Sequence, residues 1–476
     1  MRAHEAGALH ADGYGRPSWL AVPHDVNTLV PTLWADSVAR GTDGVLTVGG
    51  MSVLDLAAQV GTAAYVLDEL DFRRRAAEFR DAWSEAFDDL CGGADVYYAG
   101  KAFLCTEVAR WIRDDGLRLD VCSGGELAVA QRAQMPGERI GLHGNNKSVA
   151  ELEAAVAYGD RGVGRIVVDS FEEIERLAQV AARQGRVARV MVRVTVGVEA
   201  HTHEFIATAH EDQKFGFSLS GGAAAEAVRE ILAHAPDLEL IGLHSHIGSQ
   251  IFDTAGFEVS ARRILGLHAD VSREHGLELP ELDLGGGFGI AYTTEHDPLP
   301  PKALAAGLAD IVERECRAHG VGVPRVSVEP GRAIAGPSTF TLYEVGTVKQ
   351  VALDAGATRT YLSVDGGMSD NIRTALYDAN YSCTLASRRS DAPGVLSRVV
   401  GKHCESGDIV VMDEFLPADV RAGDLLAVPG TGAYCRALSN QYNHTPRPPV
   451  VAVRDGVARV IVRRESIDDL LALDMP

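Results

Sequence analysis

The chain has 476 residues, of which 46% are hydrophobic and 23% are charged, and its formal net charge is −21. This length suits two domains better than one, and the negative charge argues against nucleic acid or an anionic membrane surface as the partner. The sequence contains no apolar run of about 18 residues, so we expect no membrane span. No secretory signal is visible at the N-terminus. The seven scattered cysteines, without CxxC pairs, favour a reducing cytoplasm.

The first part of the chain differs from the rest in composition and in hydrophobic periodicity. Residues 1–42 are rich in Gly, Pro, His and Asp and show little periodicity, so we expect an irregular or partly disordered extension. Short β-prone runs follow at 45–48 and 63–67, with a helical pattern between them. We expect residues 43–70 to contribute to a β domain. A charged helical pattern then covers 71–89.

From Asp95 onward, apolar β-branched runs alternate with helical periodicity eight times. This alternation predicts an α/β fold, a closed parallel (β/α)8 barrel of the TIM type over 71–336. A doubly wound open sheet is the alternative, because alternation alone does not prove closure. The eight runs lie at 95–101, 117–122, 139–143, 165–169, 189–195, 240–245, 281–284 and 325–329.

After residue 336 strand-like runs dominate and helical patterns become rare. Runs at 339–348, 360–364, 398–401, 408–412 and 424–428 predict a second, mainly β domain over 337–476. A hairpin is expected around Asp455-Gly456, since this dipeptide separates two β-branched runs.

The lysine that ends the first run is the first catalytic candidate. Catalytic groups of such barrels sit at the C-terminal ends of the strands. Lys101 ends the apolar run 95–101, and apolar surroundings disfavour the ammonium and leave a nucleophilic amine. Such an amine can form an imine with a carbonyl cofactor such as pyridoxal 5'-phosphate.

Glycine turns follow the seventh and eighth runs, at 285–289 and 329–332. Glycine lets backbone N–H groups approach a phosphate, and barrels often bind phosphate with these two loops. Two tight turns with a salt bridge are the structural alternative. Glu329 could pair with a protonated pyridine nitrogen, or with a cation such as Arg193. His246 could lie flat on a cofactor ring, or be a satisfied core histidine.

A metal-dependent hydrolase is the competing idea. His244-x-His246 and His201-x-His203 offer imidazole ligands, but such a site leaves both glycine loops unexplained. We therefore predict no metal.

Taken together, nine motifs resemble those of the diaminopimelate decarboxylases, a family in the fold type III, alanine-racemase-like group of pyridoxal-phosphate enzymes. The resemblance extends from about residue 44 to the C-terminus. The motifs are YAGKA at 98–102, DVCSGGEL at 120–127, HGNNKS at 143–148, KFG at 214–216, HSHIGSQ at 244–250, GGGFG at 285–289, EPGR at 329–332, DGGM at 365–368 and CESGD at 404–408.

The resemblance implies decarboxylation of meso-2,6-diaminopimelate to L-lysine and CO2, with Lys101 as the Schiff-base lysine and Cys404 as the proton donor. It implies a homodimer with shared active sites, in which Cys404 and Glu405 come from the partner subunit. The implied cofactor contacts are Lys101, His246, Ser249, Gly285, Gly286, Gly287, Glu329, Gly331, Arg332 and Tyr434. The implied substrate contacts are Arg332, Arg373, Tyr377, Glu405 and Tyr434.

Other interpretations stay open beside these. A lone cysteine such as Cys404 is commonly a small buried hydrophobe. Arg373 and Tyr377, four residues apart, fit one face of a helix and could be a surface pair. A sister decarboxylase acting on ornithine, arginine or carboxynorspermidine is the nearest rival function, and a non-catalytic cofactor-binding homologue is another.

Overall fold

The computed structural model describes residues 15–197, 214–353 and 358–475, and the chain divides into two compact units. The β unit comprises Met1–Phe72, Ile290–Asp297 and Ile334–Pro476, and the barrel unit comprises Arg73–Gly289 and Pro298–Ala333. The short stretch Ile290–Asp297, which the sequence analysis placed within the barrel, thus groups with the β unit.

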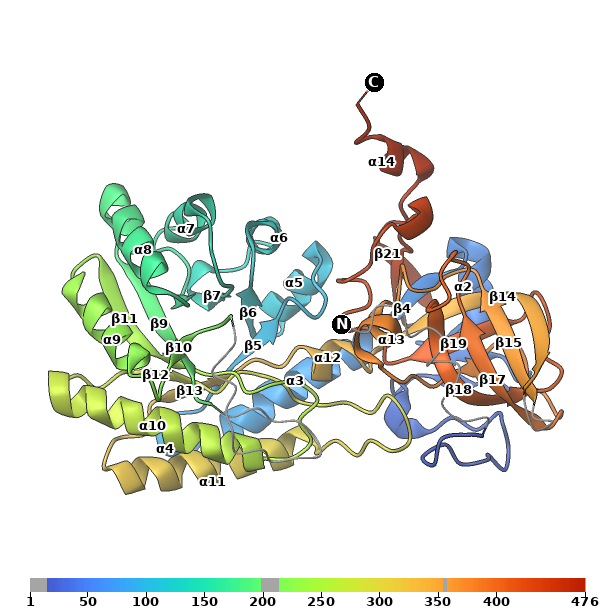
Figure 1. Ribbon diagram of the computed structural model, residues 1–476, viewed down its shortest axis with the longest axis horizontal. Coiled ribbons are helices and arrows are strands. Elements are labelled where there is room, and N and C mark those ends of the chain that lie inside the picture. Colours follow the sequence, from blue (N-terminus) through green and yellow to red (C-terminus); the bar gives the residue numbers. More distant parts are fainter. Residues whose placement is uncertain (1–14, 198–213, 354–357, 476) are drawn as a thin grey trace. The chain divides into compact units, whose positions relative to one another are not determined.

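Within the described residues of the barrel unit, eight parallel strands form a closed ring (Figure 1). The order is β9-β11-β12-β13-β5-β6-β7-β8, and pairing of β8 with β9 closes it. The predicted barrel is confirmed, and the open doubly wound sheet is wrong. The strands are β5 (Asp95–Ala99), β6 (Arg118–Val121), β7 (Ile140–Leu142), β8 (Arg165–Val168), β9 (Ala188–Thr195), β11 (Leu238–His244), β12 (Glu281–Asp283) and β13 (Arg325–Val328), with the short β10 (Phe217–Ser218) beside β9.

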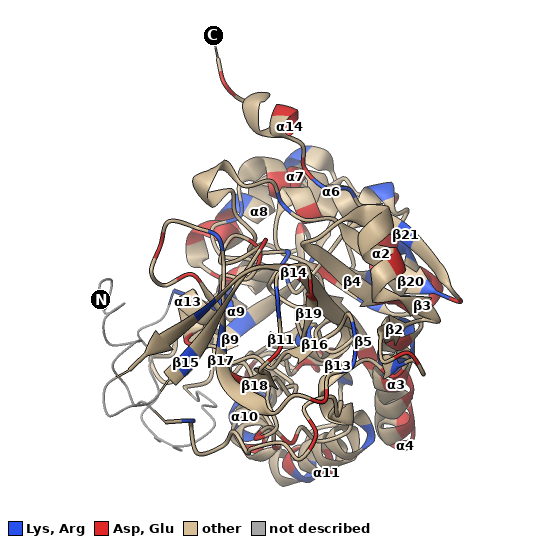
Figure 2. Ribbon diagram, turned by 90° about the vertical axis from the view of Figure 1, so that its right-hand side faces the viewer, with Lys and Arg blue, Asp and Glu red and all other residues tan. Residues whose placement is uncertain are grey.

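Helices surround these strands, and their first residues explain where they begin. Ser148 and Ser170 accept hydrogen bonds from the N–H groups of Glu151 and Glu173, which caps two helices at their N-termini. The helices are α3 (Glu69–Ala86), α4 (Asp88–Cys91), α5 (Thr106–Asp114), α6 (Gly124–Arg132), η2 (Gly137–Arg139), α7 (Val149–Val156), α8 (Phe171–Gln184), α9 (Ala223–Ala233), α10 (Ala255–His275), α11 (Pro301–His319) and α12 (Arg332–Ala335). Figure 2 shows acidic residues on α3 and α4, where part of the negative charge lies. No helix among the described residues has both the length and the apolar character that crossing a bilayer requires.

In the β unit, the main sheet has the order β18-β17-β15-β14-β4-β20-β21. The early strand β4 is antiparallel to β14 and parallel to β20, so it lies inside a sheet built mostly from the C-terminal part of the chain. The strands of the unit are β1 (Ala39–Arg40), β2 (Leu46–Val48), β3 (Met51–Ser52), β4 (Ala64–Asp68), β14 (Thr339–Ala352), β15 (Thr358–Val364), β16 (Thr384–Leu385), β17 (Gly394–Val400), β18 (Ile409–Pro417), β19 (Leu425–Pro429), β20 (Val450–Arg454) and β21 (Val457–Val462). The helices are η1 (Pro31–Leu33), α2 (Val53–Val60), α13 (Arg373–Tyr377), η4 (Tyr442–His444) and α14 (Ile467–Leu471).

The hairpin expected near the C-terminus is present as β20 and β21. Asp455 and Gly456 have φ angles of 51° and 75°, the left-handed values that a tight two-residue hairpin turn requires.

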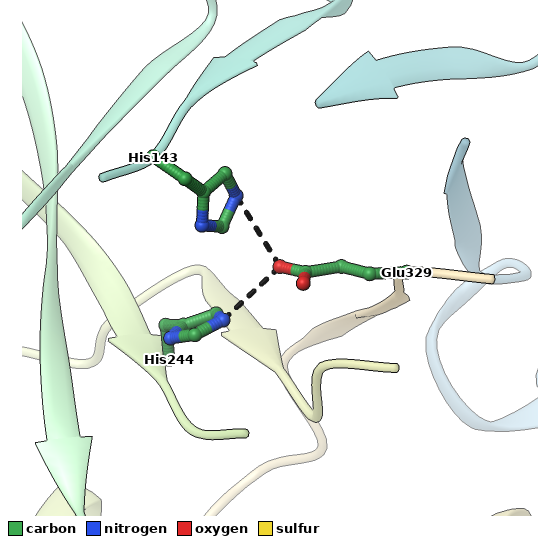
Figure 3. Close-up of side chains that lie close together, drawn as sticks. All are labelled: His143, His244 and Glu329. Carbon is green, nitrogen blue, oxygen red and sulfur yellow. Dashed lines mark ion pairs between the residues drawn. The ribbon is translucent and has the colours of Figure 1, made fainter. Parts of the chain in front are cut away.

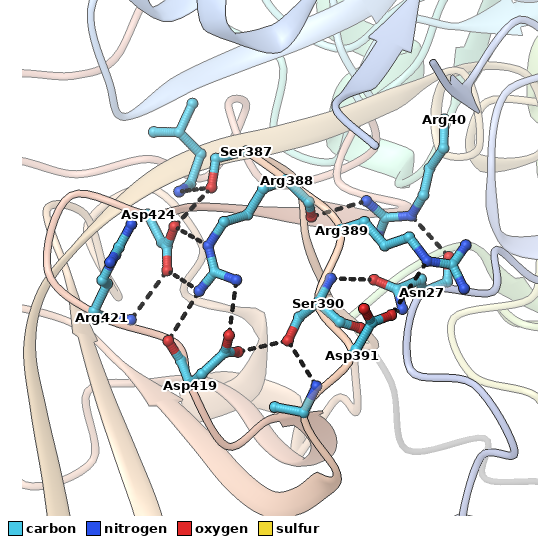
Figure 4. A network of polar contacts seen from close by, with 12 residues as sticks. Asn27, Arg40, Ser387, Arg388, Arg389, Ser390, Asp391, Asp419, Arg421 and Asp424 are labelled. Atoms are coloured by element: carbon cyan, nitrogen blue, oxygen red, sulfur yellow. Dashed lines mark hydrogen bonds and ion pairs between the residues drawn. The ribbon is translucent and has the colours of Figure 1, made fainter. Parts of the chain in front are cut away.

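The described part of the N-terminal extension, residues 15–42, is irregular but firmly attached to the β unit (Figure 4). Asn27 Nδ2 donates to the Ser390 carbonyl at 2.7 Å, and the Ser390 N–H donates to Asn27 Oδ1 at 2.9 Å. The Arg40 guanidinium donates to the Leu385 carbonyl at 2.7 Å. Side-chain hydrogen bonds to such remote positions leave no periodic pattern in the sequence, so the sequence alone does not predict them.

Candidate active site

The candidate lysine lies directly beyond the end of β5. The Gly100 N–H donates to the Asp120 carbonyl at 2.9 Å, and a Cβ on Gly100 would lie only 2.8 Å from that oxygen. This close approach fixes the turn that carries Lys101. The side chain of Lys101 is exposed, so the expectation of apolar surroundings is wrong. Burial raises the pKa of Cys122 to about 12, and the positive charge of Lys101 is among the influences that oppose this rise. Lys101 is therefore close to the ends of β5 and β6.

The loops after β11, β12 and β13 meet backbone to backbone. A Cβ on Gly286 would lie 2.2 Å from the Glu329 carbonyl oxygen, and one on Gly287 would lie 2.4 Å from that of Gly248. Arg332 Nη2 donates to Ser249 Oγ at 2.8 Å, which ties the β11 loop to the β13 loop. A guanidinium, a hydroxyl and glycine turns in one place form a donor set that fits a phosphate group.

Gly285 and Gly331 complete this glycine set. Gly285 has a φ of 71°, and its N–H donates to Asp283 Oδ1 at 2.6 Å. A Cβ on Gly331 would lie 3.0 Å from the Cβ atoms of Ala99 and Ala102, so this turn packs against the start of the lysine loop. The four glycines therefore bring the candidate phosphate loops beside the end of β5.

His246 follows β11 and is half-buried. Its Nδ1 accepts a hydrogen bond from the Gly286 N–H at 3.3 Å, which fixes the ring against the glycine turn. Burial, together with the charge of Lys101, lowers its pKa well below the ordinary value. His246 is therefore a neutral imidazole near the lysine and the glycine turns, which suits a ring that stacks on a flat cofactor.

Glu329 directly follows β13 and is buried, with 6% exposure. Its Oε1 lies 3.0 Å from Nε2 of His244 and 3.3 Å from Nε2 of His143 (Figure 3). Arg193, the cation considered as an alternative partner, instead lies 3.8 Å from Asp169. The carboxylate thus faces two histidines, which the sequence analysis had not connected with it.

Behind Glu329 the interior of the barrel carries a polar cluster. Arg165, fully buried in β8, donates to Asp283 Oδ2 at 2.5 Å and to Ser327 Oγ at 2.8 Å. Its guanidinium also lies 3.5 Å from the centre of the Tyr97 ring and 3.6 Å from Asp120 Oδ1. A buried cation with these partners stays charged and compensates the carboxylates around it.

Burial sets the charge states in this cluster. It raises the pKa of Asp120 to about 8 and lowers that of His143 to about 4. It also lowers the pKa of His244 well below the ordinary value. Near neutral pH both imidazoles are therefore uncharged, and Asp120 is largely protonated.

In the β unit, Cys404 is exposed on the loop between β17 and β18. Its N–H donates to Asn443 Oδ1 at 3.1 Å, and Asp408 holds the same loop by accepting from the Met368 and His403 N–H groups. The alternative of a small buried hydrophobe is wrong for Cys404. Glu405, beside it, is also exposed.

The two candidate residues at the ends of α13 have opposite environments. Arg373 is buried, donates to Tyr381 Oη at 2.6 Å and lies over the ring of Tyr292 at 4.7 Å, whereas Tyr377 is 61% exposed. The alternative of a surface pair is therefore wrong. Tyr434 has a φ of 64°, a strained value for a bulky residue, which is typical of functional positions.

The structure thus gathers two sets of candidates, each within its own unit. The ends of four barrel strands carry Lys101, His246, Ser249, Gly285, Gly286, Gly287, Glu329, Gly331 and Arg332. The β unit carries Arg373, Tyr377, Cys404, Glu405 and Tyr434. Loops 366–369, 401–408 and 434–440 of this unit are joined by hydrogen bonds, including Lys402 N–H to the Gly366 carbonyl and Asn440 N–H to the Ser369 carbonyl.

The alternative of a metal site used four histidines as ligands: His201, His203, His244 and His246. His201 and His203 lie outside the described residues. His244 faces Glu329, while His246 bonds to the Gly286 N–H, so the pair serves different partners. Among the described residues, His143, His244 and Glu329 do form a buried group whose ligand atoms lie within 4.8 Å of one another.

The chain is similar in sequence to known proteins along its whole length. A family model for the pyridoxal-binding domain of pyridoxal-dependent decarboxylases matches residues 74–336. A diaminopimelate decarboxylase of Mycobacterium leprae is 55% identical over 482 aligned residues that cover all of both chains, and that of Mycobacterium bovis is 57% identical over 94% of this chain and 98% of its own. The crystal structure of diaminopimelate decarboxylase from M. jannaschii in complex with L-lysine has a TM-score of 0.85 and 28% identity, and covers 93% of this chain and 98% of that one.

Proposed function

The chain belongs to the diaminopimelate decarboxylases, a family of pyridoxal-dependent decarboxylases, and from this membership we propose its reaction. The enzyme is a carboxy-lyase that converts meso-2,6-diaminopimelate to L-lysine and CO2 with pyridoxal 5'-phosphate as cofactor. Identity of 55% over the full length of a curated relative is the observation that carries this proposal.

The residues at the barrel mouth fit the cofactor. The Ser249 hydroxyl, the Arg332 guanidinium and the glycine turns at 285–287 and 331 would hold its phosphate, and Lys101 supplies the amine that carries it. His246 would lie against the ring, and Glu329 would hold the ring nitrogen. When bound, the cofactor supplies an electron sink for the charge left by loss of CO2.

The residues of the β unit then act on the substrate. Cys404 is exposed, and a thiol can deliver the proton that replaces the lost carboxyl group. Arg373, together with Arg332 of the barrel unit, would bind the distal carboxylate of the substrate, with Tyr377, Glu405 and Tyr434 beside it. Guanidinium groups suit this task because they can bind a carboxylate with two parallel hydrogen bonds.

The buried state of Arg373 favours this substrate over those of the sister decarboxylases. Its Nη1 is held by Tyr381, while its Nε has no hydrogen-bond partner among the described residues. A buried cation with donor capacity left over suits a carboxylate better than the bare amine of a diamine product. A non-catalytic homologue would have no use for an exposed thiol as a proton donor.

The assembly and the location are further parts of the proposal. We infer a homodimer in which Cys404 and Glu405 of the partner subunit complete the site, as in the family that the motifs resemble. The exposure of Cys404, Glu405 and Tyr377 supports this arrangement. The seven cysteines are all free, which supports a cytoplasmic location.

The reaction is tested by offering meso-diaminopimelate, ornithine and arginine to the purified enzyme and measuring CO2 and the amine product. We expect lysine from the first and no comparable turnover of the others. Lys101→Ala should abolish the visible absorbance of bound cofactor, whereas Lys302→Ala, at an exposed lysine of α11, should keep it. Lack of lysine formation by wild-type protein saturated with cofactor would refute the proposed reaction.

A further inference from the structure

The proposed function assigns no role to two buried histidines, His143 and His244. His143 follows β7 and His244 ends β11, so they approach Glu329 from separate strands (Figure 3). All three side chains are at most 8% exposed. Both Nε2 atoms lie close to the same oxygen, Oε1, at 3.3 and 3.0 Å. Two independent elements therefore converge on one carboxylate oxygen.

The chemistry of these groups decides what they can do for Glu329. A neutral imidazole has one N–H donor, and a buried carboxylate oxygen without donors is costly. His143 Nε2, His244 Nε2 and Glu329 Oε1 have no hydrogen bond of good geometry among the described residues, although they lie within bonding distance. His244 Nδ1 has no such partner either, so no other group competes for the ring proton.

Other charged groups border this trio and limit alternative partners. His143 Nε2 is also 3.1 Å from Asp120 Oδ1, and Arg165 Nη2 is 3.9 Å from Glu329 Oε1. Arg165 is, however, engaged with Asp283 and Ser327. Both histidine Nε2 atoms thus lie closer to Oε1 than the Arg165 guanidinium does.

We propose that His143 and His244 are positioning residues that hold Oε1 of Glu329, so that its other oxygen is directed to the ring nitrogen of pyridoxal phosphate. This inference rests on the proposed function, in which Glu329 binds that nitrogen. The histidines do not touch the substrate. They fix the orientation of the carboxylate, which is itself buried.

The experiment measures the dissociation constant of pyridoxal phosphate for the apoenzyme, by titration of its absorbance. Replacing His244 by Leu removes the N–H donor and fills its place with an apolar side chain. Replacing His244 by Gln keeps an N–H near the position of Nε2. Loss of a hydrogen bond to a charged group should weaken cofactor binding about tenfold in His244→Leu, and His244→Gln should restore most of it. His143→Leu and His143→Gln should behave in the same way. His268→Gln, at a buried histidine of α10, is the matched control and should bind as wild type does.

A double-mutant cycle separates positioning from packing. In a Glu329→Gln background, His244→Leu should weaken binding by much less than in the wild type, because the carboxylate that it serves is gone. Equal binding by wild type and both Leu variants would overturn the inference, as would an unchanged loss in the Glu329→Gln background. A stoichiometric metal in purified wild type, absent from His244→Gln, would also overturn it and make the trio a metal site. Failure of wild type to bind the cofactor would instead count against the proposed function.

Discussion

At the scale of single residues, the cysteines illustrate how burial sorts chemically similar groups. Burial raises the pKa of Cys122 to about 12 and that of Cys316 to about 11, and it raises that of Cys383 well above the ordinary value. These thiols stay protonated, and those of Cys316 and Cys383 are buried. Cys404, in contrast, is exposed on a loop that Asp408 fixes through two backbone hydrogen bonds. Exposure, and not residue type, thus singles out Cys404 as the candidate acid.

Replacing Cys404 by Ala should therefore lower kcat by at least about 100-fold, the usual contribution of a positioned general acid. Cofactor absorbance should be unchanged, because Cys404 is not among the groups proposed to bind the cofactor. The measurement compares kcat and the spectrum of the variant with those of Cys105→Ala, at a half-buried cysteine of the barrel unit. Turnover at the wild-type rate in Cys404→Ala would place the proton donor elsewhere.

Asp370 gives a prediction on pH. Burial raises the pKa of its carboxyl from 3.8 to about 7, while hydrogen bonds from Tyr343 and the Gly367 N–H oppose the shift. The folded protein keeps this proton up to about pH 7, but the unfolded chain loses it near pH 4. The folded state thus binds more protons in this window, so stability falls as pH rises, by at most about 1.4 kcal/mol per pH unit.

Asp370→Asn cannot ionise, so its melting temperature should rise relative to that of wild type between pH 4 and 7 and then stay level. Melting curves across this range test the slope. Asp391→Asn, at a side chain that is 98% exposed, is the control and should run parallel to wild type. Parallel curves for Asp370→Asn would show that Asp370 ionises at the same pH in both states.

At the scale of elements, local pattern predicted the eight barrel strands, because parallel strands buried on both faces appear as short apolar runs between helical segments. It also placed Lys101 and Glu329 at strand ends. Arg165 could not be assigned a role in this way. It begins an apolar run, and its partners Asp283 and Ser327 lie on β12 and β13. These strands face β8 across the barrel interior only once the barrel is closed. A charge inside such a run was the available signal.

Lys147 is a second strand-end residue whose role depends on tertiary contacts. It was one of several polar residues after the third strand, yet its side chain is only 2% exposed. Nζ donates to the Gly144 carbonyl at 2.6 Å, the Val167 carbonyl at 2.7 Å and Glu173 Oε1 at 2.7 Å. Lys147 therefore pins the loop that begins at His143 to β8 and α8, and its role is structural.

Lys147→Met leaves the Glu173 carboxylate buried without its cation and should cost about 3–5 kcal/mol of stability. The free energy of unfolding in urea measures this loss. The double variant Lys147→Met/Glu173→Leu removes both charges and should recover a large part of it. A single variant as stable as wild type would mean that water reaches Glu173 and replaces the ion pair.

At the scale of the whole molecule, remote pairings escaped the sequence analysis. The runs near Val45 and Tyr65 could be placed only loosely, since β4 pairs Ala64 with Leu342 of β14 and Tyr65 with Val450 of β20. The hydrophobic core also joins remote parts of the chain, because Leu46, Val48 and Val53 pack in one cluster with Leu342 and Val451. No local pattern encodes such partners. The candidate residues are likewise divided between the two units.

This division permits a test of the shared site. Lys101 lies in the barrel unit and Cys404 in the β unit, and we propose that each site combines Lys101 with Cys404 of the partner subunit. Lys101→Ala and Cys404→Ala should each be inactive alone. Half of the dimers formed from an equal mixture by co-expression are hybrids, and each hybrid has one site with both residues intact, so about a quarter of the wild-type activity should return.

The matched control combines Lys101→Ala with Glu329→Ala, both in the barrel unit. Every hybrid of that pair has one defect in each barrel, so co-expression should restore nothing. Activity is measured per mole of dimer, with CO2 release as the readout and cofactor saturating. If the Lys101→Ala and Cys404→Ala mixture is as inactive as its parents while hybrids are shown to form, Lys101 and Cys404 of one site belong to the same subunit, and the shared arrangement is wrong.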